Sequence, residues 1–335
     1  MAIVLFILFI CAGLAIISYI RKQRKKRENA LQDEIRQLHE VWQIGWEELK
    51  TQERIGEGVA GRVCKARYRD IIVAVKILRD EHDPRMFSVF AKEIKFMQTM
   101  RHPNIVLFIG AGRTSVHGQP FLVLEYAKRG SMRQVLDDSS IELSDQRKTQ
   151  FALDAAKGME FLHSLCPPRI HRDLKSDNLL VSDTWVVKVA DFGLGKPFEE
   201  RSRVQRWINV IFNKRSLTEP LLETSGAYSN GIGTARWRAP EVIRRQTKYD
   251  SSIDVYSFGI VLWEIWTRQL PFFQYKFFHD VDDAVERGER PQLAQDCPNN
   301  YLNAMQACWS SDPLSRPSFK EIVNILDDMH KTLSQ

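Results

Sequence analysis

Residues 170–178 read Ile-His-Arg-Asp-Leu-Lys-Ser-Asp-Asn, and this stretch decides the fold that we expect for the chain. Its histidine, carboxylate, lysine and amide side chains can bind ions and accept or donate protons. Two shorter motifs follow it, Asp-Phe-Gly at residues 191–193 and Ala-Pro-Glu at residues 239–241. Two others precede it, a glycine-rich run at residues 56–63 and Val-Ala-Val-Lys at residues 73–76.

The glycine-rich run reads Gly-Glu-Gly-Val-Ala-Gly-Arg-Val, with glycines at positions 56, 58 and 61. Such glycines let backbone N–H groups approach phosphate oxygens, because no Cβ stands in the way. A dinucleotide-binding fold uses the same spacing, but it needs a strand before the glycines and a helix after them. Here a strand is predicted after the glycines, at residues 62–67, so the dinucleotide-binding fold is not favoured.

Lys76 lies 15 residues after the third glycine, inside the β-rich run 73–78. A lysine is rarely buried without a partner of opposite charge. Lys76 is therefore expected to face an anion, and phosphate is the first candidate.

The five motifs, in this order, resemble the motif set of the eukaryotic protein kinases. The resemblance implies an α+β, bilobal fold, with a β-rich N-lobe that carries one helix and a mainly α-helical C-lobe. The kinase domain is expected over residues 49–332, with the N-lobe at about 49–126 and the C-lobe at about 127–332. Strands predicted at residues 105–109 and 121–124, and helices predicted at 145–165 and 253–266, agree with this order.

The resemblance also assigns catalytic roles. Lys76 would hold the α- and β-phosphates of ATP, with Glu93 on the following helix as its ion-pair partner. Asp173 would accept the proton of the substrate hydroxyl, and Lys175 would neutralise charge on the γ-phosphate.

The expected cofactors are ATP and Mg²⁺. Asn178 and Asp191 supply oxygen ligands that suit Mg²⁺, an ion that usually relies on one or two carboxylates together with phosphates. The nucleotide itself is expected to contact Ile55, Gly56, Glu57, Gly58, Val59, Gly61, Val63, Ala74, Lys76, Glu125, Ala127 and Leu180.

The resemblance also implies structural contacts. Asp254 is expected to anchor the backbone of the catalytic loop, and Glu241 is expected to pair with Arg316. An apolar stack that bridges the lobes would consist of Met97, Phe108, His171 and Phe192. Hydrophobic core packing explains these four residues as well.

Lys175 and Thr234 fit serine/threonine kinases, whereas Trp237 and the run 254–259 resemble tyrosine kinases. This mixture is typical of the tyrosine-kinase-like group, which includes Raf and the mixed-lineage kinases, and Ser/Thr activity is the expectation within it. We therefore expect an ATP-dependent protein serine/threonine kinase in intracellular signalling. The alternatives are a pseudokinase scaffold, although every catalytic position is filled, and a truncated form of a longer receptor kinase.

The activation segment that the resemblance implies runs from Asp191 to Glu241 and spans 51 residues, which is longer than usual for the family. The excess near residues 201–222 mixes apolar and basic residues. It is interpreted as a regulatory amphipathic helix, a disordered loop or a retained intron. Phosphorylation is expected at Thr224, Ser225 or Ser229, because a phosphate there can pair with Arg172.

Two single residues depart from the family pattern. Ala60 stands where an aromatic residue often tips the glycine-rich loop. Arg238 places a positive charge near the expected substrate groove, which raises the hypothesis of acidic substrates.

The N-terminus predicts a membrane anchor. Residues 2–20 carry no charge and would span roughly 28 Å as a helix, close to the ~30 Å hydrocarbon core of a bilayer. A cleaved signal peptide would have basic residues before the apolar stretch, whereas here they follow it. Residues 1–20 are therefore predicted to be a transmembrane helix.

The charge of the chain supports one topology. The net charge is +6, and Arg21–Arg27 alone carries six positive charges, which leaves 42 basic and 42 acidic residues elsewhere. The excess does not indicate nucleic-acid binding. It predicts a cytosolic kinase domain and a lumenal or extracellular N-terminus. The block is also a candidate for contact with anionic lipid, although setting the topology is a sufficient role.

Residues 21–48 are predicted to form a basic juxtamembrane segment with a short amphipathic helix. Its apolar residues Leu31, Ile35, Leu38 and Trp42 recur at helical spacing. They would pack on the adjacent domain or form a dimer. The five cysteines have no metal-ligand spacing, so no zinc site is predicted.

Overall fold

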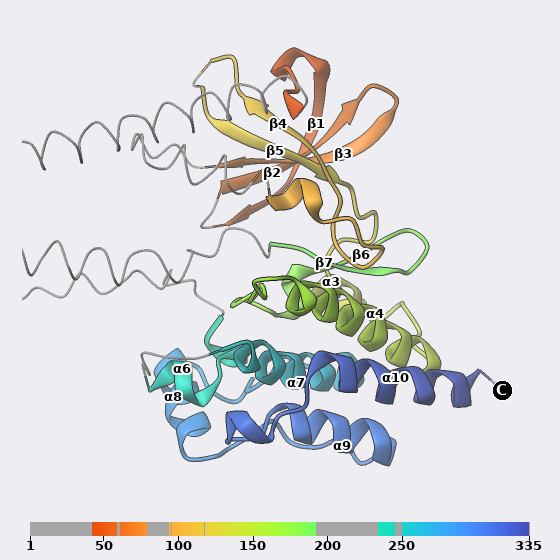
Figure 1. Cartoon of the computed structure of the whole chain (residues 1–335), viewed down its shortest axis with the longest axis vertical. Helices are drawn as coiled ribbons and strands as arrows, with labels where there is room; N and C mark the ends of the chain where they lie inside the picture. The colour runs from red at the N-terminus through yellow and green to blue at the C-terminus, as the bar shows by residue number, and fades with distance from the viewer. Residues whose placement is uncertain are drawn as a thin grey trace, which may run out of the picture.

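The computed structural model describes residues 42–58, 61–78, 94, 96–116, 118–191, 234–244 and 250–334. These residues form two lobes, a sheet-based lobe at the top of Figure 1 and a helical lobe below it. The bilobal α+β architecture is thus confirmed. The transmembrane helix predicted at residues 1–20 and most of the amphipathic segment lie outside the described residues.

The upper lobe is built on a five-stranded antiparallel sheet with the strand order β1-β2-β3-β5-β4. The strands are β1 (Leu49–Gly58), β2 (Gly61–Tyr68), β3 (Ile71–Leu78), β4 (Phe108–Arg113) and β5 (Pro120–Glu125). The strands predicted at residues 62–67, 73–78 and 121–124 are all present.

Strand β3 shows why this sheet carries a site. Its side chains alternate between two faces, as in any strand. Val73, Val75 and Ile77 are at most 2% exposed and pack in the core of the upper lobe. Ala74 and Lys76 therefore share the opposite face, which places the lysine away from that core.

The strand predicted at residues 105–109 is wrong in its first half, because β4 begins at Phe108. Ile105 is 1% exposed and belongs to the core of the lower lobe. The N–H of Val106 donates to the carbonyl of Val189 at 3.0 Å. The first half of this apolar run thus connects the two lobes. Its composition alone does not distinguish such a connection from a strand.

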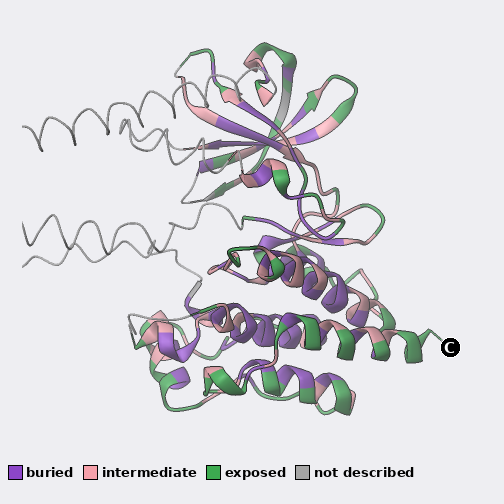
Figure 2. Ribbon diagram, viewed as in Figure 1, coloured by how far each residue is buried: buried purple, intermediate pink, exposed green. Residues whose placement is uncertain are grey.

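The lower lobe contains α3 (Met132–Asp137), α4 (Asp145–Ser164), α6 (Pro240–Ile243), α7 (Ser252–Thr267), α8 (Phe278–Glu286), α9 (Asn299–Cys308) and α10 (Phe319–Leu333). The 3-10 helices η2 (Ser176–Asn178), η3 (Thr234–Trp237) and η4 (Pro313–Ser315) and the hairpin β6 (Leu179–Val181) and β7 (Val187–Val189) complete it. Helices α4 and α7 confirm the two predicted helices. Buried residues line one face of α4 and make up most of α7 (Figure 2).

The segment before β1 packs on the sheet. The ring of Trp42 lies 6.0 Å from that of Phe108, and the N–H of Ile44 donates to the carbonyl of Ala111 at 2.9 Å. The 3-10 helix η1 (Trp46–Glu48) then leads into β1. Trp42 therefore packs on the adjacent lobe, one of the two outcomes expected for its stripe. Within the described ranges, no helix has the length and apolarity that a membrane span requires.

The predicted pair between Glu241 and Arg316 is confirmed. Both carboxylate oxygens of Glu241 accept from the Arg316 guanidinium, at 2.6 and 2.9 Å. Both side chains are almost fully buried. Arg316 also donates to the carbonyls of Ser310 and Ser252, so the pair ties α6 and α7 to the segment after η4.

Glu241→Gln is expected to lower the free energy of unfolding by about 3–5 kcal/mol, because it leaves the Arg316 guanidinium buried without a counter-charge. The measurement is chemical denaturation followed by tryptophan fluorescence. Asp327→Asn is the matched control, because it removes a carboxylate from an exposed pair with Lys331. That variant should unfold at nearly the wild-type midpoint, and an equally small change in Glu241→Gln would contradict the assignment.

Two glycines of the glycine-rich run should respond differently to alanine. Gly61 has φ +144°, and a Cβ there would collide with the backbone oxygen of Ile77. At Gly56 the nearest atom to a Cβ would be Val63 Cβ at 4.0 Å. Gly61→Ala is expected to cost about 1–3 kcal/mol, whereas Gly56→Ala should leave the melting temperature nearly unchanged. Equal shifts of the melting temperature in the two variants would show that the backbone does not confine Gly61 more than Gly56.

Candidate active site

The predicted catalytic loop at residues 170–178 is held by one buried carboxylate. Asp254 on α7 is 1% exposed and accepts from the N–H of His171 at 2.7 Å and from the N–H of Arg172 at 2.8 Å. The Nε2 atom of His163 on α4 lies 2.8 Å from the same carboxylate. Arg172 has φ +68°, which is uncommon for a residue with a side chain and has to be held by its surroundings. The predicted anchoring by Asp254 is thus confirmed.

Asp173 follows directly, with Lys175 and Asn178 beside it. The Nζ atom of Lys175 lies 3.3 Å from Asp173 Oδ2. The side-chain amide of Asn178 donates to the Asp173 carbonyl at 2.7 Å and to Oδ2 at 3.1 Å. Asp173 Oδ1 is buried and has no hydrogen-bond partner in the described part of the chain. One carboxylate oxygen is therefore oriented by the loop, while the other is left as an acceptor.

The hairpin of β6 and β7 brings Asn178 and Asp191 to one end. Leu179 pairs with Val189, so the residues just outside the hairpin face each other. The N–H of Ala190 donates to the Asn178 carbonyl at 2.8 Å, and the ring of His171 bonds the Ala190 carbonyl at 2.9 Å. The two residues predicted to bind metal, 13 apart in the sequence, thus flank the same short ladder.

Lys76 contacts Asp191. Its Nζ atom lies 2.5 Å from Asp191 Oδ1, and the lysine side chain is almost fully buried while the aspartate side chain is about half exposed. The anion expected beside Lys76 is therefore a carboxylate in this structure. Glu93, its predicted partner, lies outside the described residues.

The residues predicted to contact the nucleotide come from both lobes. Val63 on β2 pairs with Lys76 on β3, and Ala74 pairs with Leu124 on β5, so all of them belong to neighbouring strands. Leu180 lies on β6 in the lower lobe. Val63, Ala74 and Leu180 are each partly exposed, as residues that line a ligand site should be.

The remaining nucleotide-site predictions fall at the strand ends. Ile55, Gly56 and Glu57 belong to β1, and Gly61 opens β2. Gly58 ends β1, while Val59 and the departure Ala60 lie outside the described residues. Ala127 follows β5, and its carbonyl accepts from the N–H of Gly130 at 3.1 Å.

Glu125 has a role that the sequence interpretation did not include. Its carboxylate accepts from the N–H of Leu107 at 2.6 Å and pairs with Lys188 on β7 at 2.9 Å. The Glu125 N–H donates to the Leu107 carbonyl at 3.0 Å. Glu125 therefore holds the connection between the lobes. The sequence does contain a signal for Lys188. It is a charged residue between two valines of a short strand, so its side chain lies on the face opposite to theirs.

Arg238 does not present an unpaired charge. Its guanidinium donates to both carboxylate oxygens of Asp282 on α8, at 2.9 and 3.3 Å. Burial raises the pKa of Asp282, and the positive charge of Arg238 counteracts that rise. Because Arg238 is already paired with Asp282, its charge does not support the hypothesis of acidic substrates.

The donor set suits Mg²⁺ and the phosphates of ATP. Asn178 and Asp191 offer oxygen ligands, and a magnesium ion normally completes its shell with phosphates and water. In the described part of the chain, no cluster of three or more His, Cys, Asp or Glu side chains could hold a metal alone. Asn178 and Asp191 would therefore share such an ion with the phosphates and water.

Several predictions fall outside the described residues. They are Glu93, Val59, Phe192, the excess at residues 201–222, and the phosphorylation candidates Thr224, Ser225 and Ser229. Of the predicted apolar stack, Met97 and Phe108 pack in one cluster of the upper lobe, and His171 is 2% exposed in the lower lobe.

Known proteins of similar sequence indicate the family of the chain. Residues 49–325 match the sequence profile of the protein kinase domain. The probable serine/threonine-protein kinase drkD of Dictyostelium discoideum is 39% identical over 289 residues, which cover 86% of this chain and 20% of that protein. The dual specificity protein kinase shkC of the same organism is 38% identical over 84% of this chain and 51% of its own length.

A plant protein is similar to a comparable degree. The probable serine/threonine-protein kinase SIS8 of Arabidopsis thaliana is 36% identical over 87% of this chain and 26% of its own length. The chain thus spans between a fifth and about half of the length of these relatives. The profile match covers most of the chain, so the chain belongs to the protein kinase domain family.

Proposed function

We propose that the chain is a protein serine/threonine kinase that uses ATP and Mg²⁺. The observation that carries the proposal is the meeting of the groups at residues 173–191 with Lys76, which lies 115 residues before Asp191. Asp173, with Lys175 beside it, is joined through Asn178 to the hairpin that presents Asp191, and Asp191 contacts Lys76. Phosphoryl transfer requires positioning and charge neutralisation more than covalent catalysis, and this arrangement supplies both.

Each group has a defined task in this mechanism. Asp173 accepts the proton of the attacking hydroxyl, and contacts with Asn178 and Lys175 orient its partly exposed carboxylate for this task. Lys175 lies near the same carboxylate and neutralises charge on the transferred phosphoryl group. Lys76 would hold the α- and β-phosphates of ATP, and Asp191 together with Asn178 would hold Mg²⁺. The magnesium ion supplies neutralisation of the phosphate charges when it is bound.

Serine and threonine are the proposed acceptors. Lys175 and Thr234 support this choice, and the relatives named above are serine/threonine or dual specificity kinases. The combination of Lys175 and Thr234 with Trp237 and the run 254–259 supports membership of the tyrosine-kinase-like group. A pseudokinase scaffold is less well supported, because Lys76, Asp173 and Asp191 are all present.

Membrane anchoring is the second part of the proposal. It is supported by the uncharged residues 2–20 and by the basic block 21–27 that follows them. With this orientation the kinase domain faces the cytosol, where ATP is available. The basic block would then lie at the surface of the cytoplasmic leaflet.

Asp173→Asn should reduce phosphate transfer to a serine- and threonine-containing protein by at least about a hundredfold, because the proton acceptor is lost. The measurement uses the full chain in detergent buffer with labelled ATP and Mg²⁺, followed by phosphoamino-acid analysis. Asp177→Asn is the matched control, because Asp177 is exposed in the same loop and loses the same charge. Nucleotide binding without turnover in the wild-type chain would favour the scaffold.

The anchoring proposal predicts that the wild-type chain stays in the membrane pellet after alkaline carbonate extraction. Replacing Leu8 and Ile10 together by arginine should release it, since each charge at the centre of a bilayer helix costs about 2.5–3.5 kcal/mol. Replacing the same two residues by alanine is the control and should leave the chain in the pellet. Release of the wild-type chain by carbonate would eliminate the anchor.

A further inference from the structure

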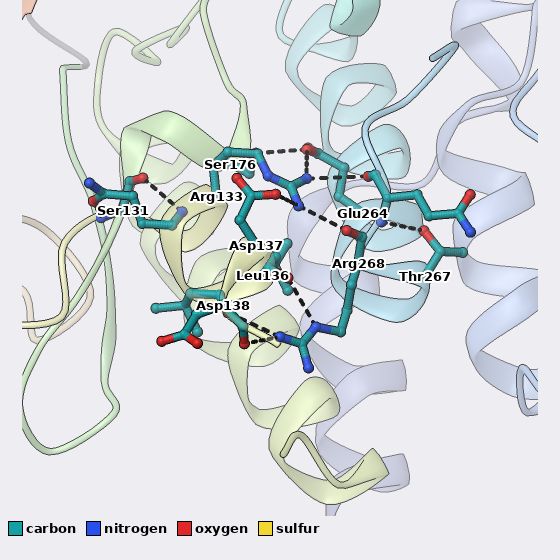
Figure 3. Close-up of polar contacts among 12 residues, drawn as sticks. Ser131, Arg133, Leu136, Asp137, Asp138, Ser176, Glu264, Thr267 and Arg268 are labelled. Atoms are coloured by element: carbon teal, nitrogen blue, oxygen red, sulfur yellow. Dashed lines mark hydrogen bonds and ion pairs between the residues drawn. The ribbon is translucent and has the colours of Figure 1, made fainter. Parts of the chain in front are cut away.

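Glu264 is a buried carboxylate near the end of α7, and the proposed mechanism does not use it. It is 0% exposed, and both of its oxygens are occupied. Oε1 accepts from Ser176 Oγ at 2.7 Å and from Arg133 Nη1 at 3.0 Å. Oε2 accepts from Trp237 Nε1 at 2.6 Å. Figure 3 shows Ser176 and Arg133 converging on this side chain from separate elements.

The Ser176 contact reaches the catalytic loop. Ser176 is fully buried and lies between Lys175 and Asn178, the two residues that contact Asp173. The N–H of Asn178 donates to the Lys175 carbonyl at 3.0 Å and closes this turn around Ser176. A shift of the Ser176 side chain would therefore move both neighbours of Asp173.

The Trp237 contact reaches the far end of the segment that begins at Asp191. Trp237 ends η3, is 4% exposed, and lies four residues before Glu241. Its carbonyl accepts from Ser257 Oγ on α7 at 2.8 Å. Trp237 is thus fixed to α7 by both its backbone and its ring, and the ring shares Glu264 with the catalytic loop.

Arg133 supplies the positive charge that this carboxylate needs. It lies on α3, where it also donates to Asp137 at 2.8 Å and to the carbonyl of Arg268 at 2.9 Å. The guanidinium of Arg268 in turn donates to the carbonyls of Leu136 and Asp138 (Figure 3). The charge of Glu264 is therefore compensated from a helix that is locked onto the end of α7.

The three donors matter because the carboxylate is fully buried. Burial raises the pKa of Glu264 to about 7, and the hydrogen bonds from Ser176 and Trp237 and the charge of Arg133 counteract that rise. Loss of any one donor favours the protonated form. A protonated carboxyl presents a donor to groups that themselves donate, so the remaining contacts would weaken as well.

We propose that Glu264 is a positioning residue, which sets the catalytic loop through the Ser176 hydroxyl and couples it to the end of the activation segment through Trp237. The proposal rests on the kinase function proposed above. It assigns no contact with substrate to Glu264, because the carboxylate is fully enclosed.

The test compares Ser176→Ala, Trp237→Phe, Glu264→Gln and the double variant Ser176→Ala/Glu264→Gln in the full chain. Trp237→Phe keeps an aromatic ring and loses the N–H donor. Asp137→Asn is the matched control, because it removes a contact of Arg133 that does not involve Glu264 and has an exposed carboxylate. Two readouts are taken, the kcat per nucleotide-binding site and the amide hydrogen exchange of residues 175–178 without substrate.

Ser176→Ala should lower kcat per binding site about tenfold, the effect of losing one hydrogen bond to a charged group, with the Kd for ATP nearly unchanged. Its amides at residues 175–178 should exchange faster than in the wild type. Trp237→Phe should change both readouts in the same direction. In the double variant, Ser176→Ala should have a smaller effect than in the wild type, because the Ser176 hydroxyl would then donate to a neutral amide oxygen in place of a carboxylate. Asp137→Asn should match the wild type.

Wild-type values of kcat per site and exchange in Ser176→Ala would overturn the proposal. So would independent, multiplying effects in the double variant, because Ser176 would then act through another partner. If Glu264→Gln does not fold, Ser176→Ala and Trp237→Phe still decide, since each leaves the carboxylate with two donors. A wild-type chain without turnover would refute the kinase function alone, and the exchange data would still decide the role of Glu264.

Discussion

The carboxylate of Asp254 is the contact on which the catalytic half of the molecule depends. It accepts two consecutive backbone N–H groups, those of His171 and Arg172, and it lies beside the ring of His163. Arg172 needs this support, because a positive φ at a residue with a Cβ is unfavourable on its own. Local contacts from Asn178 and Lys175 then orient Asp173, but the backbone before it depends on Asp254.

Helix α7 supplies a second carboxylate ten residues later, about 15 Å along its axis. Asp254 holds the backbone at the start of the catalytic loop, and Glu264 holds the Ser176 side chain near its end. Asp173 and Lys175 lie between these fixed points. A rigid, almost fully buried helix thus frames a short loop at both ends, and such a frame keeps catalytic groups oriented.

Much of this fold could be predicted from the sequence, because its signals are local. Alternation in β3 assigns Lys76 to the face opposite Val75, and helical periodicity locates α4 and α7 to within a few residues. The prediction fails at Ile105, whose apolar character fits a strand as well as a bridge between lobes. Gly61 is a similar case, since its motif suggested contact with phosphate, whereas its backbone is also confined by Ile77.

The sequence by itself determined which residue types are present and in what order, and this was enough for the family and for the expected catalytic groups. Tertiary structure decided which of them meet. Lys76 pairs with a carboxylate 115 residues away, and Glu264 receives Ser176 and Arg133 from 88 and 131 residues away. Many carboxylates in the sequence could pair with a given buried cation, and only the path of the chain determines which one lies beside it. Such a pair matters for stability, because a charge removed from water is costly unless it has a partner inside the protein.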